Sequence, residues 1–426
     1  MGRDSRERRP IVRWLGLPLT VCALSVLVAS CAGIPPPFAP PRVAVGDPSF
    51  GPTLEAYTAA PIRSGNRVEV LLNGEQIFPA QLQAIRSAHV SFTYAQYLFE
   101  TGPPANALVR AMSERCQAGV HGHILIDGVG SDNMPPEDRE ALERAGCEVA
   151  LFHPLDPAEV WQVNHRNHRR VLVIDGRIGF TGSSGASSKW MGNGRAQGYW
   201  RQTDVRLEGR AVNDLQAAFV ENWLDATGRA LGGEQYFPQL TSKGDVLAQI
   251  VRGSPERGGF AVYAMFLFAI SSAQRSIYLT NPYFVPDEPI MMALIEARQR
   301  GVRVVLLLPG IIDHEIVKDA SRAGFGRLMD AGVEMYEYQA GLLHAKTITV
   351  DGMWATVGSA NLDNRSLTLN EEINLVVYDR AVADRLEKIF ENDLVYSRLI
   401  DAQRWRVRSL WQRFMEFLSV PVRDQL

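Results

Sequence analysis

The sequence has few cysteines and no excess of basic side chains, and each shortage excludes a class of protein. Four cysteines among 426 residues are too few for a fold that depends on disulfides. The formal net charge is −3, and it becomes −6 when residues 1–30, which hold five arginines and two acids, are set aside. Such a chain lacks the basic surplus of a non-specific nucleic-acid binder, so no nucleic-acid partner is expected. With 46% hydrophobic residues, the composition is that of a globular protein of two or three domains.

The N-terminus lacks an apolar run long enough for an ordinary membrane-spanning helix. Residues 3–13 are rich in arginine, and the apolar stretch at 14–30 is shorter than the about 20 residues that a helix needs to cross a bilayer. Small residues then precede Cys31, so residues 1–30 are predicted to be a signal peptide of lipoprotein type, with Cys31 as the lipidation site. A plain signal peptide or an uncleaved anchor is the alternative. We expect an exported, membrane-associated lipoprotein of a bacterium, facing the periplasm or the cell exterior.

The rest of the chain divides by composition. Residues 31–66 are rich in proline and show no hydrophobic period, which predicts an extended tether. From residue 67, β-rich runs such as 90–99 and 121–128 alternate with helix-like stretches, which predicts an α/β fold with helices on both faces of a buried sheet. Residues 398–426 carry several arginines and place apolar residues near one helical face. This amphipathic segment either lies on an anionic lipid surface or caps the preceding domain.

The body of the chain contains an internal repeat. Residues 145–149 parallel residues 331–335, and residues 168–182 parallel residues 344–358. Such a duplication predicts two similar domains, residues 67–235 and 236–397, related by a pseudo-twofold axis.

Each repeat carries a histidine, a cation two residues later and an aspartate five residues after the cation. Histidine and cation point to the same face of a strand, and the aspartate with its following glycine closes a hairpin turn. Imidazole is nucleophilic at neutral pH and the cation neutralises phosphate oxygens, so the pattern is typical of phosphoryl transfer. Two such histidines supply one nucleophile and one general acid. The two sets are His168, Arg170 and Asp175, and His344, Lys346 and Asp351.

This double element resembles the H-x-K-x4-D signature of the phospholipase D superfamily, over roughly residues 67–418. Longer runs at 164–168, 199–206, 280–287, 341–346 and 358–366 make it most similar, within that superfamily, to bacterial cardiolipin synthases. The resemblance implies two tandem phospholipase D-like α/β/α sandwich domains and no cofactor or metal. It also implies a phosphohistidine intermediate, phosphatidylglycerol as the substrate at a membrane surface, and cardiolipin and glycerol as the products.

The resemblance also assigns roles to residues. His168 is the expected nucleophile and His344 the general acid and base, although the pseudo-symmetry leaves their order open. One acid on a later strand should hold each imidazole through Nδ1, and spacing selects Asp204 and Glu372. The expected phosphate-binding donors are Ser183, Ser359 and Asn361.

Two positions depart from the family pattern. Arg170 stands where the family has lysine, which keeps the charge but changes its shape. Gly185 stands at the position that matches Asn361, so one donor is missing from the first repeat. Because both histidines are retained, we still expect activity.

Several alternatives stay open at this point. An exported phospholipase D that uses water or another alcohol would need the same site. A nuclease is disfavoured by the acidic charge, and a non-catalytic lipoprotein by the two intact histidines. Cys116 and Cys147 could pair in an oxidising compartment, but the sequence does not fix their separation. The spacing of His165 and His168 gives only weak support to a metal site.

Overall fold

The computed structural model describes residues 39–156, 163–255, 260–313 and 315–409. The predicted export signal, Cys31 and residues 410–426 lie outside the described residues. None of the helices within these ranges is both long and apolar enough to cross a membrane.

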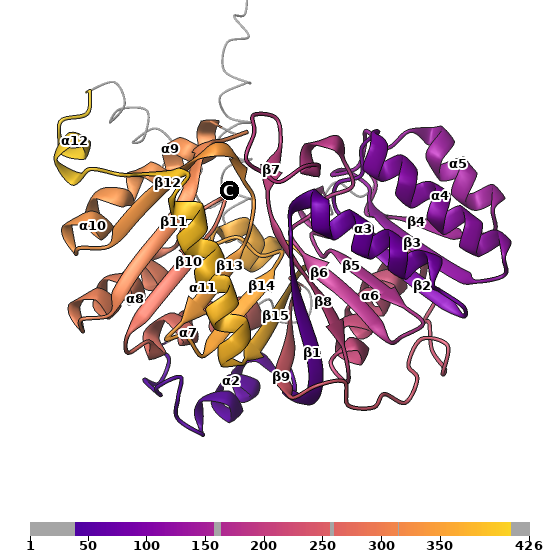
Figure 1. The fold of residues 1–426 in the computed structure, drawn as a ribbon, viewed down its shortest axis with the longest axis horizontal. Helices are drawn as coiled ribbons and strands as arrows, with labels where there is room; N and C mark the ends of the chain where they lie inside the picture. Colours follow the sequence, from indigo (N-terminus) through magenta and orange to yellow (C-terminus); the bar gives the residue numbers. More distant parts are fainter. Residues whose placement is uncertain (1–38, 157–162, 256–259, 314, 410–426) are drawn as a thin grey trace, which may run out of the picture. The chain divides into compact units, whose positions relative to one another are not determined.

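The first half of the described chain is a mixed sheet with helices on both faces, drawn from indigo to magenta in Figure 1. Its strands lie in the order β4-β3-β2-β5-β6-β8-β1, and only β2, β3 and β4 run parallel to one another. Its elements are β1 (Arg63–Leu72), α3 (Asn73–Arg86), β2 (Ser91–Gln96), α4 (Pro103–Gln117), β3 (His121–Asp127), α5 (Pro136–Arg144), β4 (Glu148–Phe152), β5 (Val171–Ile174), β6 (Ile178–Gly182), η3 (Ser188–Trp190), β7 (Trp200–Arg201), β8 (Thr203–Glu208) and α6 (Val212–Thr227).

The second half repeats this order as β12-β11-β10-β13-β14-β15-β9, which confirms the predicted duplication. Strand β9 pairs antiparallel with β1, so the two sheets share one path of hydrogen-bonded strands. The elements of the second half are β9 (Val246–Gly253), α7 (Phe260–Ser272), β10 (Ser276–Thr280), α8 (Glu288–Gln299), β11 (Arg303–Ile311), α9 (Glu315–Ala323), α10 (Phe325–Asp330), β12 (Glu334–Leu343), β13 (Thr347–Val350), β14 (Trp354–Gly358), η4 (Arg365–Leu369), β15 (Glu372–Tyr378), α11 (Arg380–Leu394), β16 (Ser397–Leu399) and α12 (Ala402–Arg406).

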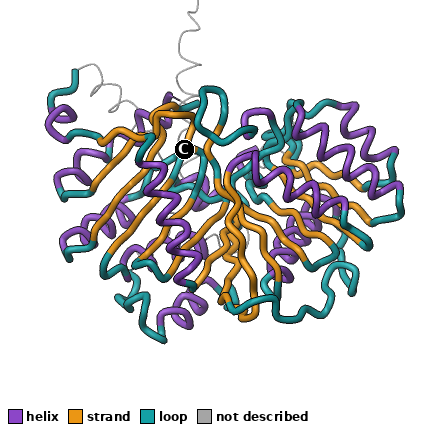
Figure 2. Tube along the Cα trace, viewed as in Figure 1, coloured by secondary structure: helices purple, strands orange, loops and turns teal. Residues whose placement is uncertain are grey.

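Helices flank the strands, as the α/β pattern predicts (Figure 2). Apolar side chains fill layers on both sides of the strands. Helices α3, α4 and α5 pack on one face of the first sheet, and α7 and α8 pack on one face of the second. Helices α6 and α11 share a third core with strands of both halves, including Val205 of β8 and Leu375 of β15. The two halves therefore share buried apolar surface, which holds their strand ends in fixed positions.

The predicted tether at 31–66 is wrong for its C-terminal part. Residues Phe50–Thr58 form helix α2, and strand β1 already begins at Arg63. Phe50 stacks on Phe268 of α7 with ring centroids 5.0 Å apart, and Leu54 is buried beside it. These two residues are four apart, so they share one face of a helix. The high proline content of residues 31–66 favoured the prediction of an extended tether over that of a helix with this apolar pair.

The predicted C-terminal segment also begins within the fold. Strand β16 pairs with β12 from Ser397 to Leu399, so Arg398 belongs to the second sheet. Helix α12 follows, and its Trp405 packs on Phe325 of α10 with ring centroids 5.4 Å apart. The described part of the segment therefore packs against the second half, as the capping alternative requires. The lipid-binding alternative concerns mainly residues 410–426 and stays a prediction.

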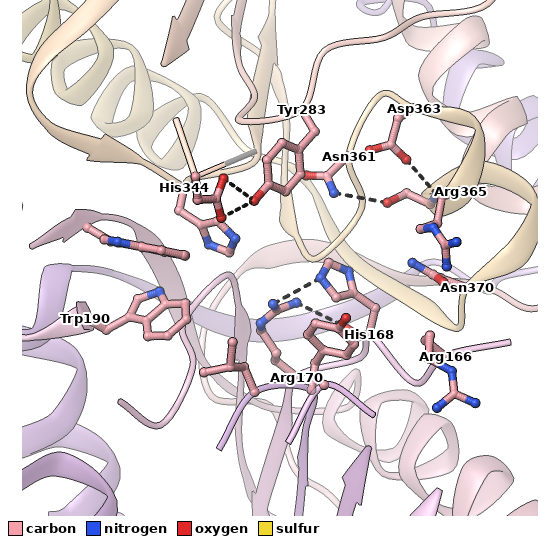
Figure 3. Close-up of a pocket in the computed structure, with 16 residues that line it drawn as sticks. Arg166, His168, Arg170, Trp190, Tyr283, His344, Asn361, Asp363, Arg365 and Asn370 are labelled. Atoms are coloured by element: carbon pink, nitrogen blue, oxygen red, sulfur yellow. Dashed lines mark hydrogen bonds between the residues drawn. The ribbon is translucent and has the colours of Figure 1, made fainter. Parts of the chain in front are cut away.

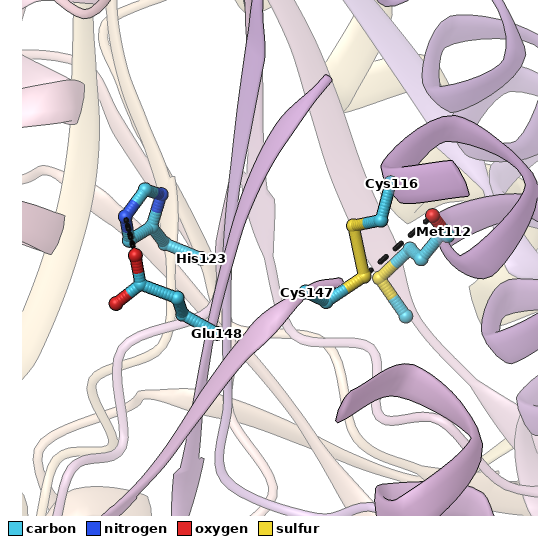
Figure 4. The surroundings of a disulfide bond; sticks show 5 residues. All are labelled: Met112, Cys116, His123, Cys147 and Glu148. Atoms are coloured by element: carbon cyan, nitrogen blue, oxygen red, sulfur yellow. Dashed lines mark hydrogen bonds and ion pairs between the residues drawn. A yellow bond between two sulfur atoms is a disulfide. The ribbon is translucent and has the colours of Figure 1, made fainter. Parts of the chain in front are cut away.

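A disulfide joins Cys116, in the last turn of α4, to Cys147, just before β4 (Figure 4). The Cα atoms are 5.4 Å apart, within the range that a disulfide spans, and both side chains are buried. The question that the sequence left open is thereby answered. The bond ties the outer helix layer to the edge of the first sheet.

We expect Cys116→Ser to lower the free energy of unfolding by about 3 kcal/mol. The bond closes a loop across a sequence separation of 31 residues, and opening it lets the unfolded chain gain conformational entropy. Urea unfolding of the oxidised wild type and the variant measures the difference. The same comparison under reducing conditions is the control, because the two curves should then nearly coincide. Equal stabilities under oxidising conditions would contradict a closed bond in the native protein.

Candidate active site

A cavity of about 450 Å³ lies where the two halves meet, and both repeat histidines line it (Figure 3). His168 lies just before β5 of the first sheet, and His344 lies between β12 and β13 of the second. Both side chains are buried, with exposed fractions of 7% and 4%. The cavity size is in the range of small-molecule sites, and the two rings share it.

His168 is held by the second half of the chain. Its Nδ1 lies 2.8 Å from Oε1 of Glu372, and its backbone N–H donates to the carbonyl of Glu371 over 2.9 Å. An ionised carboxylate only accepts hydrogen bonds, so the proton of the neutral imidazole belongs on Nδ1. Nε2 then carries a lone pair instead of a proton, and Nη2 of Arg170 lies 3.1 Å from it.

His344 is held by the first half in a related way. Its Nδ1 lies 3.0 Å from the carbonyl oxygen of Ser183, and its backbone N–H donates to the carbonyl of Arg201 over 2.7 Å. A carbonyl also only accepts, so Nδ1 again carries the proton. Lys346 Nζ lies 3.1 Å from Nε2. The cation therefore lies beside the imidazole in both repeats, but the four residues stand just before β5 and β13, so their predicted place within a strand is wrong.

Burial and positive charge together keep the two imidazoles neutral in the empty site. Burial lowers the pKa of His168 well below its ordinary value, and Arg170 and Lys346 lower it further. Burial likewise lowers the pKa of His344, with Lys346 as the nearest charge. A neutral imidazole with a free Nε2 lone pair can act as a nucleophile or a base. A bound phosphodiester would offset the two cations and favour protonation.

The two aspartates of the repeated motif are not in the cavity, and their predicted catalytic role is wrong. The Asp175 carboxylate accepts hydrogen bonds from the backbone N–H groups of residues 89–91, where β2 begins. Asp351 binds residues 274–276 at the start of β10 in the same way. Both have positive φ, 51° and 55°, and each turns its chain into a hairpin. Their spacing from the histidines reflects the length of a strand.

The predicted orienting acids behave differently from each other. Glu372 binds the imidazole of His168, which belongs to the other repeat. Asp204 accepts from the backbone N–H of Ser183 and from the hydroxyl of Ser184, and no bond between it and an imidazole occurs among the described residues. It therefore fixes the loop whose carbonyl holds His344. The prediction that an acid holds an imidazole through Nδ1 is therefore confirmed for Glu372 and wrong for Asp204, because a backbone carbonyl takes that place at His344.

The three predicted phosphate-binding donors do not all lie in the cavity. The hydroxyl of Ser183 donates to the carbonyl of Thr203 over 3.2 Å, and that of Ser359 donates to Glu372. Neither side chain lines the cavity, so a role for these two hydroxyls as phosphate donors is wrong in this arrangement. Asn361 does line it, and its role as a phosphate donor stays a prediction.

The aromatic wall of the cavity was missed from the sequence. Tyr97 meets the His168 ring edge-on at 4.8 Å, and Trp200 lies 5.0 Å from the His344 ring. Tyr97 and Tyr283 stand 186 residues apart, which is also the offset between residues 145–149 and 331–335, so the repeat itself could have revealed them. The remaining lining residues are Leu98, Gly130, Arg166, Trp190, Asp313, Asp363, Arg365, Ser366 and Asn370.

The departure at Gly185 has a structural cause. A Cβ atom there would lie 2.8 Å from the ring of Trp190, which is buried and lines the cavity. The first repeat thus places an indole where the second has the side chain of Asn361. Arg170 keeps the cation at its place and also donates to the His168 carbonyl over 2.9 Å.

Within the described ranges, no three of the histidine, cysteine, aspartate and glutamate side chains are placed to share a metal ion. Nε2 of His165, which together with His168 suggested a metal site, lies 3.0 Å from Oε1 of Glu371. Nothing in its surroundings adds support for a metal at that spacing.

Residues 81–194 and 266–394 match the family described as cardiolipin synthase, PLD-like domain. A cardiolipin synthase of Staphylococcus aureus is 33% identical over 364 residues, covering 85% of this chain and 74% of its own. One from Geobacillus kaustophilus is 35% identical, covering 84% and 72%. In fold, the chain is similar to the crystal structure of phosphatidylserine synthase from Haemophilus influenzae, with a TM-score of 0.67 at 12% identity, covering 88% of this chain and all of that one.

We expect Asp175→Asn to lower stability and to leave the chemistry largely intact. The carboxylate binds three backbone N–H groups, so its loss should cost about 1–3 kcal/mol in the free energy of unfolding. Turnover per folded molecule should stay within about threefold of wild type, because the residue is remote from the cavity. Chemical denaturation and assays at a temperature where both proteins are folded measure the two effects. A large loss of turnover without a loss of stability would restore the catalytic interpretation.

We expect Glu372 and Asp363 to make a contribution to stability that falls as the pH rises from 5 to 8, whereas His168 and His344, whose pKa values are lowered, contribute in the opposite direction. Burial raises the folded-state pKa of Glu372 and of Asp363 to about 7, from 4.5 and 3.8. The folded chain therefore holds these protons more tightly, and their contribution, full below about pH 4, is lost as the pH passes 7. Glu372→Gln should flatten this dependence, as measured by urea unfolding at several pH values.

Glu371→Gln is the matched control. Burial raises the pKa of Glu371, but Arg169, His165 and Ser254 together outweigh that effect and bring it to about 2. The group is thus ionised from pH 5 to 8, so its loss should lower stability without changing the slope. Identical slopes for wild type and Glu372→Gln would contradict the raised pKa of Glu372.

Proposed function

Because the chain belongs to the cardiolipin synthase family of proteins with phospholipase D-like domains, we propose that it is a phosphatidyltransferase that makes cardiolipin from two phosphatidylglycerols and releases glycerol. One observation carries the proposal. Two buried histidines from two repeats line one cavity, each with a cation beside its Nε2.

In the first step, Nε2 of His168 attacks the phosphorus of one phosphatidylglycerol. The bond from phosphorus to the headgroup glycerol breaks, and that oxygen takes the proton from Nε2 of a protonated His344. The products are a phosphatidyl-histidine and free glycerol. Arg170 and Lys346 neutralise the non-bridging oxygens while charge shifts among them.

In the second step, a hydroxyl of another phosphatidylglycerol gives its proton to Nε2 of His344. Its oxygen bonds to phosphorus as the bond to His168 breaks. Cardiolipin leaves, His168 is neutral again, and His344 is protonated for the next cycle. The two steps together convert two phosphatidylglycerols into one cardiolipin and one glycerol.

The assignment of His168 as nucleophile is supported by an asymmetry between the two rings. A phosphorylated imidazole carries a positive charge, which its Nδ1–H partner must stabilise. His168 has the carboxylate of Glu372 as that partner, whereas His344 has only a backbone carbonyl. A carboxylate stabilises a cation more strongly than a neutral carbonyl does, so His168 suits the covalent role and His344 the proton transfers.

We further propose that the protein is exported and works at a bacterial membrane, facing the periplasm or the cell exterior. The predicted signal at residues 1–30 and the lipidation site at Cys31 support export. The disulfide between Cys116 and Cys147 is the kind of bond that persists in an oxidising compartment.

We expect His168→Ala and His344→Ala each to abolish cardiolipin formation. The first variant lacks the nucleophile, and the second lacks the proton donor for the departing glycerol. Thin-layer analysis of products from vesicles with phosphatidylglycerol as the sole lipid measures the loss. His165→Ala, outside the cavity lining, is the comparison variant for expression and folding. Full turnover in either histidine variant would refute the shared mechanism, and phosphatidic acid without cardiolipin from wild type would indicate hydrolysis.

A further inference from the structure

The cavity extends past the two histidines to a third cation, Arg365, at the start of η4 (Figure 3). Arg170 and Lys346 both bind an imidazole, but the guanidinium of Arg365 contacts the side-chain oxygen of Asn164 over 3.3 Å. Among the described residues, no carboxylate lies within ion-pair distance of it. Arg365 also lowers the pKa of His168, after burial and the two nearer cations, so it lies within electrostatic reach of the reacting ring. The mechanism above does not use this charge.

Two asparagine side chains of the same cavity wall have unsatisfied oxygens. Asn361 donates through Nδ2 to the hydroxyl of Ser366 over 3.2 Å, but its Oδ1 has no partner. Oδ1 of Asn370 likewise has none, and both residues are more than nine-tenths buried. A buried acceptor without a donor is unfavourable, so these two oxygens are available to accept hydrogen bonds from a ligand with hydroxyl groups.

The chemistry of an acceptor lipid matches this wall. Phosphatidylglycerol attacks through the terminal hydroxyl of its headgroup, and its own phosphodiester lies three carbon atoms away from that oxygen. A site for this acceptor therefore needs hydroxyl-binding groups near the reacting phosphorus and a second cation farther along. Water as the acceptor needs neither. The glycerol that departs from the donor can use the same hydroxyl contacts, but it carries no second phosphate.

We propose that Arg365, with Asn361 and Asn370, forms a subsite for the phosphoglycerol headgroup of the acceptor lipid. Arg365 pairs with the phosphodiester of the acceptor, and the two asparagine oxygens accept hydrogen bonds from its glycerol hydroxyls. Arg170 and Lys346 serve the reacting phosphate. This proposal rests on the proposed function and adds to it a residue that favours transfer to an anionic lipid over transfer to water.

We expect R365Q to lose transfer to lipid and to keep transfer to small acceptors. The full chain is incubated with phosphatidylglycerol vesicles and ethanol, and cardiolipin, phosphatidic acid and phosphatidylethanol are quantified together. Cardiolipin should fall by about tenfold, as expected for the loss of one charge-assisted contact. Phosphatidic acid and phosphatidylethanol should stay within about twofold of wild type in total, because Arg365 does not contact the reacting phosphate.

Two variants complete the experiment. R365K keeps the charge and should recover part of the cardiolipin yield, although it loses the planar fork. R67Q removes an exposed arginine of β1 and should leave all three products unchanged. Thermal unfolding verifies that each variant is folded before its products are compared.

The outcomes separate the two proposals. An equal fall of all three products in folded R365Q would place Arg365 at the reacting phosphate and overturn the acceptor subsite, as would an unchanged cardiolipin yield. Wild-type protein that forms phosphatidic acid and phosphatidylethanol but no cardiolipin would instead overturn the proposed function, and the subsite with it.

Discussion

Hydrogen bonds that cross between the two halves are the constraint on which the site depends. Each of the two histidines of the repeated motif, His168 and His344, lies near a strand end of one half, and its backbone N–H and ring are hydrogen-bonded by the other half. Arg169, between His168 and Arg170, adds to this link because its buried guanidinium donates to the carbonyl of Gly253. Neither half alone can orient its own histidine. The duplicated fold thus makes one active site from two incomplete ones.

The electrostatics of the cavity follow from its position in the shared core. Burial favours neutral imidazoles and raises the pKa of Glu372, while Arg170 and Lys346 place positive charge beside the two rings, and Asp313 and Asp363 also line the cavity. A phosphodiester adds negative charge beside Arg170 and Lys346, so its binding and the protonation of His344 support each other. The site is therefore preorganised for an anionic substrate, and little rearrangement of charge is needed during the reaction.

The two repeats have diverged where their tasks differ. The first provides the indole of Trp190, for which Gly185 leaves space, and the second provides Asn361 at the corresponding place. Glu372 binds an imidazole, whereas Asp204 fixes a loop. A symmetric site would bind donor and acceptor alike. In the proposed mechanism, this asymmetry gives covalent chemistry to His168 and proton transfer to His344, and the proposed acceptor subsite occupies one wall of the cavity.

The sequence by itself determined the duplication, the α/β class and the two histidines with their cations, because these are written in local periodicity and in motifs that recur at fixed offsets. It misplaced Asp175 and Asp351, since a fixed spacing along a strand does not show which end of that strand faces the site. It also missed helix α2 and could not pair Glu372 with His168. The 2.8 Å bond between Glu372 and His168 joins residues about 200 positions apart, and it exists only once the two sheets have packed together. Only the tertiary structure decided such contacts, because packing and not spacing brings those atoms together.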